Sequence, residues 1–240
     1  MRILLFDVDG TLLLTNAGGT RAIGKALREV FQVPKPCMDV DYRGRTDSSI
    51  LRELLELNGI DVTADNFHRL SHAYSQRLPT VLEDHGGRVL PGVMELLQRL
   101  VTHDDTACYV MTGNLQQTAT QKLSHFGLGS FFRGVFGGDH DEDRRHLAER
   151  TARTLRSRYG PVAADRVCVI GDTPEDVRCG NAIGASVLAV CTGNFTKGEL
   201  AATGAEHIHD DLSEVDVIYR KLISVEPGSN GDGDAEGSAD

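Results

Sequence analysis

Residues 2–11 read RILLFDVDGT, an apolar run that passes directly into two aspartates, a glycine and a threonine. An apolar run bounded by such a turn sequence predicts a buried β-strand over residues 2–6. Carboxylates beside the end of a buried strand lose hydration and repel each other, so they are unfavourable unless a cation or ordered donors compensate them. Asp7 and Asp9 therefore predict a bound metal and a reaction.

Two patterns follow this strand. Residues 17–31, 47–58 and 63–78 have helical spacing, with no convincing strand between them. From residue 91 onward strands and helices alternate, which predicts a parallel sheet covered by helices. The expected strands are 107–111, 134–137, 167–170, 186–190 and a weaker one at 206–208, and the expected helices are 92–103, 114–126, 144–158, 174–184 and 212–223.

The predicted fold class is α/β, with a Rossmann-like, doubly wound parallel sheet as the core and an inserted α-helical cap domain. We expect residues 1–14 and 89–224 to form the core and residues 15–88 the cap. Residues 225–240 are expected to be a disordered acidic tail, which either binds a partner or only aids solubility. Glycines at 86, 87 and 92 lie where the chain returns to the core, either as a hinge or as an ordinary loop.

Composition excludes several classes of partner. The 240 residues carry 35 acids and 25 bases, a net charge of −10, which argues against nucleic acid or an anionic membrane as the main partner. No run approaches the roughly 18 apolar residues of a membrane span, and no signal peptide precedes the first strand, so a cytoplasmic location is expected. The five cysteines lack CxxC spacing and are expected to be reduced. No feature predicts an oligomeric state.

Three expected strands end in short polar turns that contain glycine. Ligands of parallel sheets collect at these carboxyl ends. Asp7 and Asp9 point to the same side of an extended segment, one suited to attack and the other to proton transfer. The Thr112 hydroxyl and the amides of Gly113 and Asn114 are donors suited to a phosphate.

The third turn, GDTPED at residues 171–176, adds two further acids. Asp172 and Asp176 offer the oxygen ligands that Mg²⁺ prefers, and a divalent ion would offset the carboxylates and attract a phosphate. Simpler interpretations stay open. Thr112 also fits a polar strand end, and Asp176 fits the third position of a helix capped by Thr173.

The motifs DxDGT, Thr-Gly-Asn and GDTxxD, with a helical insertion after the first, resemble those of the haloacid dehalogenase superfamily of Mg²⁺-dependent phosphatases. The similarity is to phosphoglycolate phosphatase-like members with a helical C1-type cap, and it covers essentially residues 1–223. It implies that Asp7 is the nucleophile that forms an aspartyl-phosphate, and that Asp9 protonates the leaving oxygen and then activates water. It also implies that Mg²⁺ is held by Asp7, the Asp9 backbone carbonyl and Asp172, with Asp176 supporting its water shell.

One position departs from the family pattern. The family usually has a Lys, less often an Arg, near the start of the helix before the last motif, where it neutralises the nucleophile and the phosphate. This chain has no Lys between Lys122 and Lys197, but two arginines stand at the expected place. A guanidinium can bind phosphate with two hydrogen bonds. We predict Arg144 for this role, with Arg145 as the alternative.

In the predicted cap, residues 43–47 read RGRTD and resemble the Gly-Arg-Thr-Asp turn that many capped members carry over the active site. Arg45 is therefore a candidate contact for the anionic part of a substrate, or else a surface residue beside an Asp47 N-cap. His207 and His209 have no third ligand nearby in sequence, so they are not predicted to bind metal. The acidic run at 139–143 is expected to be a solvated loop.

The leading functional prediction is Mg²⁺-dependent hydrolysis of a small organic phosphomonoester, such as a phosphoglycolate-like acid, a sugar phosphate or a nucleotide. Asp9 argues against dehalogenase and phosphonate-cleaving relatives, which lack this second acid. A sugar phosphomutase similar to β-phosphoglucomutase keeps both acids and remains the alternative. A receiver-type phosphoacceptor domain is less favoured, because such domains are uncapped and about half this length. The expected partner is a small phosphorylated metabolite, with no nucleic acid and no membrane.

Overall fold

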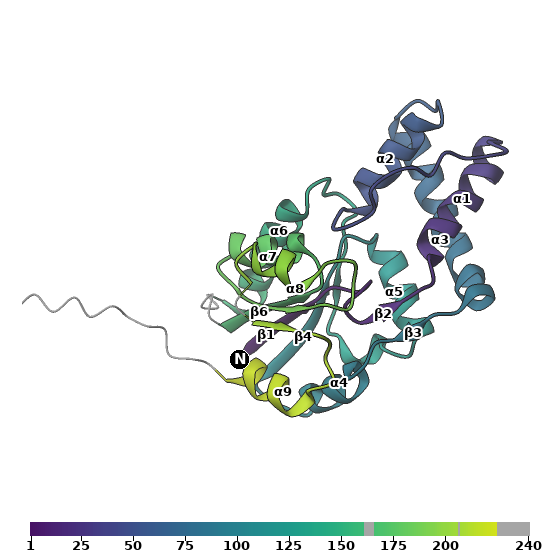
Figure 1. The fold of residues 1–240 in the computed structure, drawn as a ribbon. Coiled ribbons are helices and arrows are strands. Elements are labelled where there is room, and N and C mark those ends of the chain that lie inside the picture. Colours follow the sequence, from purple (N-terminus) through teal and green to yellow (C-terminus); the bar gives the residue numbers. More distant parts are fainter. Residues whose placement is uncertain (161–165, 206, 225–240) are drawn as a thin grey trace, which may run out of the picture.

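A computed structural model of the chain describes residues 1–160, 166–205 and 207–224. Its main sheet is parallel, with the strand order β5-β4-β1-β6-β7-β8 (Figure 1). These strands are β1 (Arg2–Phe6), β4 (Thr106–Met111), β5 (Val135–Phe136), β6 (Val167–Gly171), β7 (Ser186–Val190) and β8 (His207–His209). The predicted parallel sheet is confirmed, and Glu206 of the weakest predicted strand lies outside the described residues.

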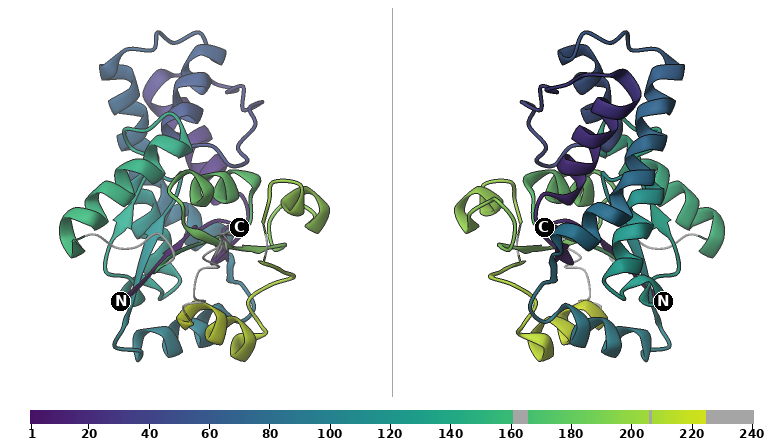
Figure 2. Two further views of the ribbon diagram at one scale, coloured as in Figure 1. Left: turned by 90° about the vertical axis from the view of Figure 1, so that its left-hand side faces the viewer. Right: turned by 90° about the vertical axis from the view of Figure 1, so that its right-hand side faces the viewer.

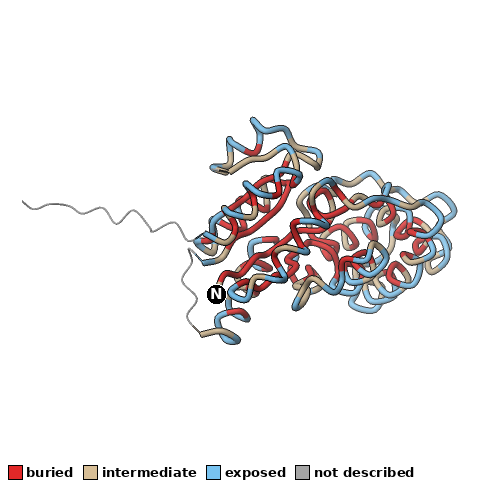
Figure 3. The backbone as a smooth tube through the Cα atoms, turned by 90° about the horizontal axis from the view of Figure 1, so that it is seen from below, coloured by how far each residue is buried: buried red, intermediate tan, exposed pale blue. Residues whose placement is uncertain are grey.

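Helices cover both faces of this sheet because alternate residues of a strand point to opposite sides. Leu4 and Phe6 belong to one apolar cluster with α4, α5 and α9, whereas Ile3 and Leu5 belong to another with α6 and α7. Figure 3 shows the buried backbone concentrated along the strands and the inner sides of the helices. The helices are α4 (Val93–Val101), α5 (Gln116–His125), α6 (Arg144–Tyr159), α7 (Pro174–Ala182), α8 (Lys197–Ala201) and α9 (Val215–Ile223).

Three further helices, α1 (Gly18–Phe31), α2 (Asp47–Leu57) and α3 (Ala64–His85), pack around an apolar cluster of their own. They stand to one side of the sheet, above the core in both views of Figure 2. We call them the cap helices. The bounds of the predicted cap domain stay a prediction.

The prediction that the third cap helix ends at 78 is wrong, because α3 continues through Pro79 to His85. A proline inside a helix has no N–H for the carbonyl four residues earlier. That carbonyl belongs to Ser75, and it accepts a hydrogen bond of 2.9 Å from the side chain of Gln121 on α5. A core helix thus supplies the donor that the proline removes.

A short antiparallel pair, β2 (Leu13–Leu14) with β3 (Arg88–Val89), joins the two segments that connect the cap helices to the core. No strand is predicted here from the sequence. Gly87 permits this pairing, because a Cβ at that position would lie 2.2 Å from the Leu14 carbonyl oxygen. The two connections therefore enter the core side by side (Figure 1).

Residues 225–240, predicted as a disordered tail, lie outside the described residues. Among the residues that are described, no helix combines the length and apolar character needed to cross a membrane. All five cysteines are free thiols, in agreement with the prediction, and three of them are buried: Cys108, Cys168 and Cys179.

Candidate active site

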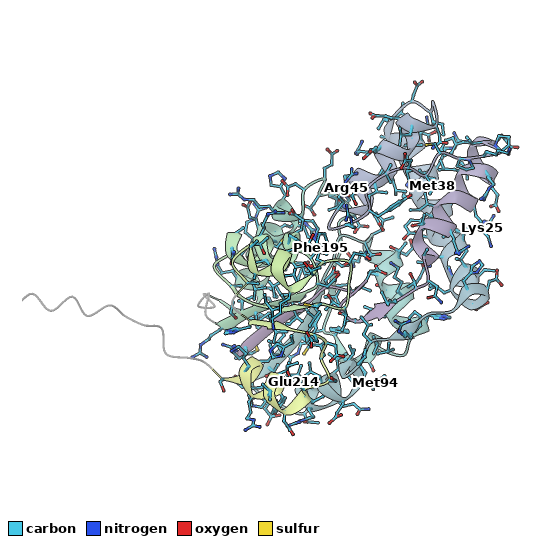
Figure 4. The ribbon with its side chains drawn as sticks, in the orientation of Figure 1. Lys25, Met38, Arg45, Met94, Phe195 and Glu214 are labelled. Atoms are coloured by element: carbon cyan, nitrogen blue, oxygen red, sulfur yellow. The ribbon has the colours of Figure 1, made fainter. Side chains whose placement is uncertain are left out.

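The three polar turns meet at one edge of the sheet. Strand β1 lies between β4 and β6, so Asp7, Thr112 and Asp172 follow three neighbouring strands. The chain winds outward in both directions from β1, and such a switch point is where parallel sheets bind ligands. A cleft of about 410 Å³ opens here between core and cap. Figure 4 labels Arg45 on its cap side and Phe195 on its core side.

Three of the predicted acids form a tight buried cluster. Carboxylate oxygens of Asp7, Asp172 and Asp176 lie within 4.8 Å of one another. Burial, followed by the charge of Asp176, raises the pKa of Asp7 to about 7. Burial, followed by the charges of Asp176 and Asp7, raises the pKa of Asp172 well above its usual value. A divalent cation would relieve this repulsion, and an all-oxygen donor set suits Mg²⁺.

The backbone around Asp172 is shaped for close approach. A Cβ on Gly10 would lie 2.4 Å from Oδ2 of Asp172, and a Cβ on Gly193 would lie 1.7 Å from the same oxygen. Gly10 also has a positive φ of 87°. The hydroxyl of Thr11 donates to Oδ1 of Asp172 at 2.8 Å. The Thr11 hydroxyl therefore helps to fix the Asp172 carboxylate, and the two glycines leave the space that this carboxylate occupies.

Arg144 is the cation that the structure brings to these acids. It is the first residue of α6, and its buried guanidinium donates to Asp176 and lies 3.5 Å from Oδ1 of Asp7. Burial alone would lower its pKa, but the Asp176 and Asp7 carboxylates outweigh burial and raise it. Its Nε is buried and has no hydrogen-bond partner among the described residues. The alternative, Arg145, is 70% exposed and pairs with Glu149.

Asp176 combines the two interpretations that the sequence left open. Its Oδ2 accepts from the amide and the hydroxyl of Thr173, at 3.0 and 2.7 Å, which completes a capping box at the start of α7. Its Oδ1 faces the Arg144 guanidinium. The residue therefore caps a helix and belongs to the acid cluster.

Asp9 lines the same cleft, and its side chain is 39% exposed. Its Oδ2 accepts a hydrogen bond of 2.8 Å from the side-chain amide of Asn114. The same amide nitrogen donates to the buried Thr112 hydroxyl at 2.9 Å. The backbone amide of Gly113 has no hydrogen-bond partner within the described parts of the chain. The predicted Thr112-Gly113-Asn114 turn thus lies beside the two aspartates with a donor still available.

Lys122 is a site residue that is not among those predicted from the sequence. Its ammonium is buried, with a side chain only 4% exposed, and lies 2.5 Å from Oδ2 of Asp9 and 2.6 Å from Oδ1 of Asn114. The family pattern places a lysine only near the start of the helix before the last motif. A signal was nevertheless present, because Lys122 stands with Thr118 and Ala119 on the buried face of α5, where lysine is unusual.

Arg45 approaches the site through its backbone. A Cβ on Gly113 would lie 2.1 Å from the Arg45 carbonyl oxygen. The guanidinium of Arg45 instead pairs with Glu53 of the cap at 2.5 Å. Arg45 still lines the cleft, at its border.

One interpretation of the sequence makes Asp47 the N-cap of its own helix, and the structure shows that this is wrong. Thr46 is the N-cap of α2, because its side chain accepts from the amide of Ser49. Asp47 instead caps a core helix, since its Oδ2 accepts a hydrogen bond of 2.8 Å from the amide of Leu115. Burial raises the pKa of Asp47 to about 6, although the charge of Lys122 acts in the opposite direction.

The acidic run at 139–143 is more than the solvated loop that was expected. Asp139 accepts a hydrogen bond from the amide of Gln116, at the start of α5. Asp141 is buried and pairs with Arg150 at 2.6 Å. The negative charge of the run therefore serves partly to fix α5 and α6 at this edge of the sheet.

Known proteins share this architecture. Residues 4–190 match the family model of haloacid dehalogenase-like hydrolases. A 5'-nucleotidase of Pseudomonas aeruginosa is 28% identical over 211 residues, which cover 88% of this chain and 91% of that protein. A phosphoglycolate phosphatase of Rhodospirillum rubrum is 28% identical over 221 residues, which cover 89% of each. The crystal structure of CbbY from Rhodobacter sphaeroides in complex with phosphate has a TM-score of 0.71 at 18% identity, covering 90% of this chain and 96% of that one.

The doubly wound sheet, with acids at its carboxyl edge, is an α/β architecture of the Rossmann-like class. The chain belongs to the haloacid dehalogenase-like hydrolase family. Within that family it is a phosphatase. The family resemblance predicted from the three motifs is thereby confirmed.

Proposed function

We propose that this phosphatase hydrolyses a small organic phosphomonoester with Mg²⁺, by way of an aspartyl-phosphate on Asp7. The observation that carries the proposal is the different environment of the two aspartates. Asp7 lies buried in the acid cluster beside Arg144, whereas Asp9 is partly exposed and held by Asn114 and Lys122. One carboxylate is placed to attack and the other to move protons.

The proposed metal site uses residues that the structure brings together. Asp7 and Asp172 would hold Mg²⁺ directly, with the Asp9 carbonyl, and Asp176 would support its water shell. When bound, the ion neutralises the carboxylates and draws negative charge off the transferring phosphoryl group. The raised pKa values of Asp7 and Asp172 support a cation at this position.

We assign the phosphate itself to donors that line the same cleft as Asp7. The Arg144 guanidinium has an unpaired buried Nε, the amide of Gly113 has no partner within the described chain, and Thr112 supplies a hydroxyl. Donors arranged in advance around a phosphoryl group stabilise the charge of its transition state. Arg144 here takes the part that a lysine usually takes in the family.

The proposed reaction has two steps. First, a carboxylate oxygen of Asp7 forms a bond to phosphorus while the bond from phosphorus to the ester oxygen breaks. The ester oxygen keeps the electron pair of the broken bond and accepts a proton from Asp9. Next, Asp9, now a carboxylate, takes a proton from water. The water oxygen then bonds to phosphorus, the Asp7–phosphorus link breaks, and inorganic phosphate leaves with the Asp7 carboxylate restored.

The substrate class remains broad in this proposal. Relatives matched over most of this chain carry the names 5'-nucleotidase and phosphoglycolate phosphatase. Both names denote hydrolysis, which supports a phosphatase over a phosphomutase. Arg45 stays a proposed contact for an anionic substrate group, which requires it to leave Glu53. A cytoplasmic location also stays a prediction.

A panel of phosphate esters with Mg²⁺ tests the proposal. We expect inorganic phosphate to be released from at least one sugar phosphate, nucleotide or phosphorylated acid, and Asp7→Asn to abolish this release. Products distinguish the mutase, which would return an isomeric sugar phosphate instead of inorganic phosphate. A folded protein that hydrolyses no ester in the panel would overturn the proposal.

A further inference from the structure

The two carboxylate oxygens of Asp9 differ sharply in their contacts. Oδ2 accepts from Lys122 at 2.5 Å and from Asn114 at 2.8 Å. Oδ1 accepts no hydrogen bond from any described residue. We propose that Lys122 is a positioning residue that binds Oδ2 of Asp9 and so leaves Oδ1 as the oxygen that exchanges protons with the substrate. The inference rests on the proposed function, in which Asp9 is the general acid and base.

Lys122, Asn114 and Asp9 form a closed triangle of hydrogen bonds. The ammonium donates to Oδ1 of Asn114 at 2.6 Å as well as to Asp9. The amide nitrogen of the same Asn114 then donates to Asp9 and to the buried hydroxyl of Thr112. Each member fixes the next, because the ammonium contact sets which end of the Asn114 amide faces Asp9. Rotation of the Asp9 carboxylate would break two of these bonds.

Burying an ammonium is unfavourable unless several groups compensate it. Lys122 is 4% exposed, and its charge also acts on the buried Asp47 of the cap. The ammonium thus contacts Asp9 of the core, while its charge also acts on Asp47 at the start of α2. Its position follows from α5, whose start is fixed by the bond from the Leu115 amide to Asp47.

This arrangement also favours the charge that Asp9 acquires during the reaction. After giving its proton to the leaving oxygen, Asp9 is a carboxylate, and the adjacent ammonium stabilises it. Arg144 cannot do this, because its partners are Asp7 and Asp176. The two buried cations therefore have different roles: Lys122 acts on the proton-transfer residue Asp9, and Arg144 acts on the nucleophile and the phosphate.

A double-mutant cycle tests the inference. Lys122→Met removes the charge and the donors but keeps the length of the side chain, and Asp9→Asn removes the acid. With an alkyl phosphate ester, we expect Lys122→Met to lower kcat about 10- to 100-fold, with KM and the inhibition constant of inorganic phosphate changed less than about threefold. With an aryl ester, whose leaving group needs little protonation, the loss should be smaller. In the Asp9→Asn background, Lys122→Met should cause no further loss.

Two further variants serve as controls for the double-mutant cycle. Lys25→Met removes an exposed lysine that pairs with Asp84 at 3.7 Å, and it should leave kcat unchanged. Lys122→Gln keeps a donor without the charge, and replaces Lys122→Met if the latter does not fold; its loss of kcat should be smaller. Circular dichroism and thermal melts check the fold of each variant.

Three results would overturn the inference. One is an unchanged kcat in a folded Lys122 variant. Another is the same fold-loss in the wild-type and Asp9→Asn backgrounds, which would mean that Lys122 does not act through Asp9. The third is a binding of inorganic phosphate weakened well beyond about threefold, which would make Lys122 a phosphate contact.

A wild-type protein that releases no phosphate would instead overturn the proposed function. In that case ¹⁵N NMR of the lysine ammonium groups decides the contact on its own. We expect one ammonium resonance that is protected from exchange with water, is lost in Lys122→Met and shifts in Asp9→Asn. Absence of such a resonance would contradict the inference without reference to activity.

Discussion

The backbone N–H of Asp47 donates a hydrogen bond of 2.7 Å to the carbonyl of Gly113, so the start of cap helix α2 lies directly on the turn that follows β4. The neighbouring Ser48 hydroxyl adds a bond of 2.6 Å to the Gly138 carbonyl of the core. The structure therefore has the start of α2 docked over the edge of the sheet that carries the acids. Docking of this kind excludes water and strengthens the electrostatic interactions inside a site.

Gly113→Ala should disturb this docking. The added Cβ would lie 2.1 Å from the Arg45 carbonyl oxygen, so either the segment that precedes α2 or the turn must move. Since a shift of about 1 Å in a catalytic site can cost 100-fold, we expect kcat/KM to fall about 100-fold while the fold persists. Gly129→Ala is the matched control, because its Cβ would meet nothing within 4 Å. Equal activity in the two variants would refute the role of this contact.

Arg144→Met and Arg145→Met separate the two neighbouring arginines. Arg144 is buried against Asp7 and Asp176, whereas Arg145 is exposed and pairs with Glu149. We expect Arg144→Met to lower kcat about 10²- to 10³-fold, as for the loss of one preorganised donor to a transition state. Arg145→Met should leave kcat within about twofold. Steady-state kinetics of the pair measures both, and a larger loss from Arg145→Met would reverse the assignment.

Mg²⁺ should stabilise the protein through the acid cluster. A ligand that binds only the folded state raises the melting temperature with its concentration. Thermal melts with and without Mg²⁺ should show this rise in the wild type and little of it in Asp172→Asn. EDTA should abolish phosphate release, and added Mg²⁺ should restore it. A melting temperature that responds to Mg²⁺ equally in both proteins would place the metal elsewhere.

Asp47 should make stability depend on pH in a defined direction. Its folded pKa is about 6 against an ordinary value of 3.8, so between these values the folded state keeps a proton that the unfolded state has lost. The free energy of unfolding therefore falls as the pH rises through this window and does not change further above it. The charged or titratable groups acting on Asp47 are Lys122 and Asp9, with Tyr74 beside them.

Asp47→Asn removes this titration but keeps an oxygen that can accept from the Leu115 amide. From pH 4 to pH 7 the unfolding free energy of the wild type should therefore fall relative to that of Asp47→Asn, by about 2 kcal/mol. Urea titrations at several pH values measure the difference, in which other titrating groups cancel. A difference that is independent of pH, or of opposite sign, would contradict the prediction.

The strand-end motifs predicted most of this architecture because each couples a local pattern to a fixed place in a parallel sheet. Asp7, Thr112 and Asp172 could be placed together since carboxyl ends of parallel strands meet at one edge. Lys122 could not be placed, because its partner Asp9 is 113 residues away in sequence. The continuation of α3 past Pro79 was unpredictable for a similar reason, since it depends on a donor from Gln121 of another helix.

The short β2–β3 pair and α8 were also missed. Two-residue strands have no periodicity to detect, and their pairing depends on how the cap connections return to the core. Helix α8 spans only Lys197–Ala201, although the capping box of Thr196 and Glu199 marks its start. Local signals of this length predict a turn as readily as a helix.

The central claim is that Asp7 carries the phosphoryl group, and mass spectrometry of acid-quenched enzyme tests it most directly. In Asp9→Asn, which lacks the group proposed to activate water, an aryl phosphate ester should leave one phosphoryl group on the peptide that contains Asp7. The same peptide from Asp7→Asn treated identically should carry none. Phosphate release by a fully active Asp7→Asn, or turnover with no phosphoryl group on this peptide at any quench time, would contradict the account.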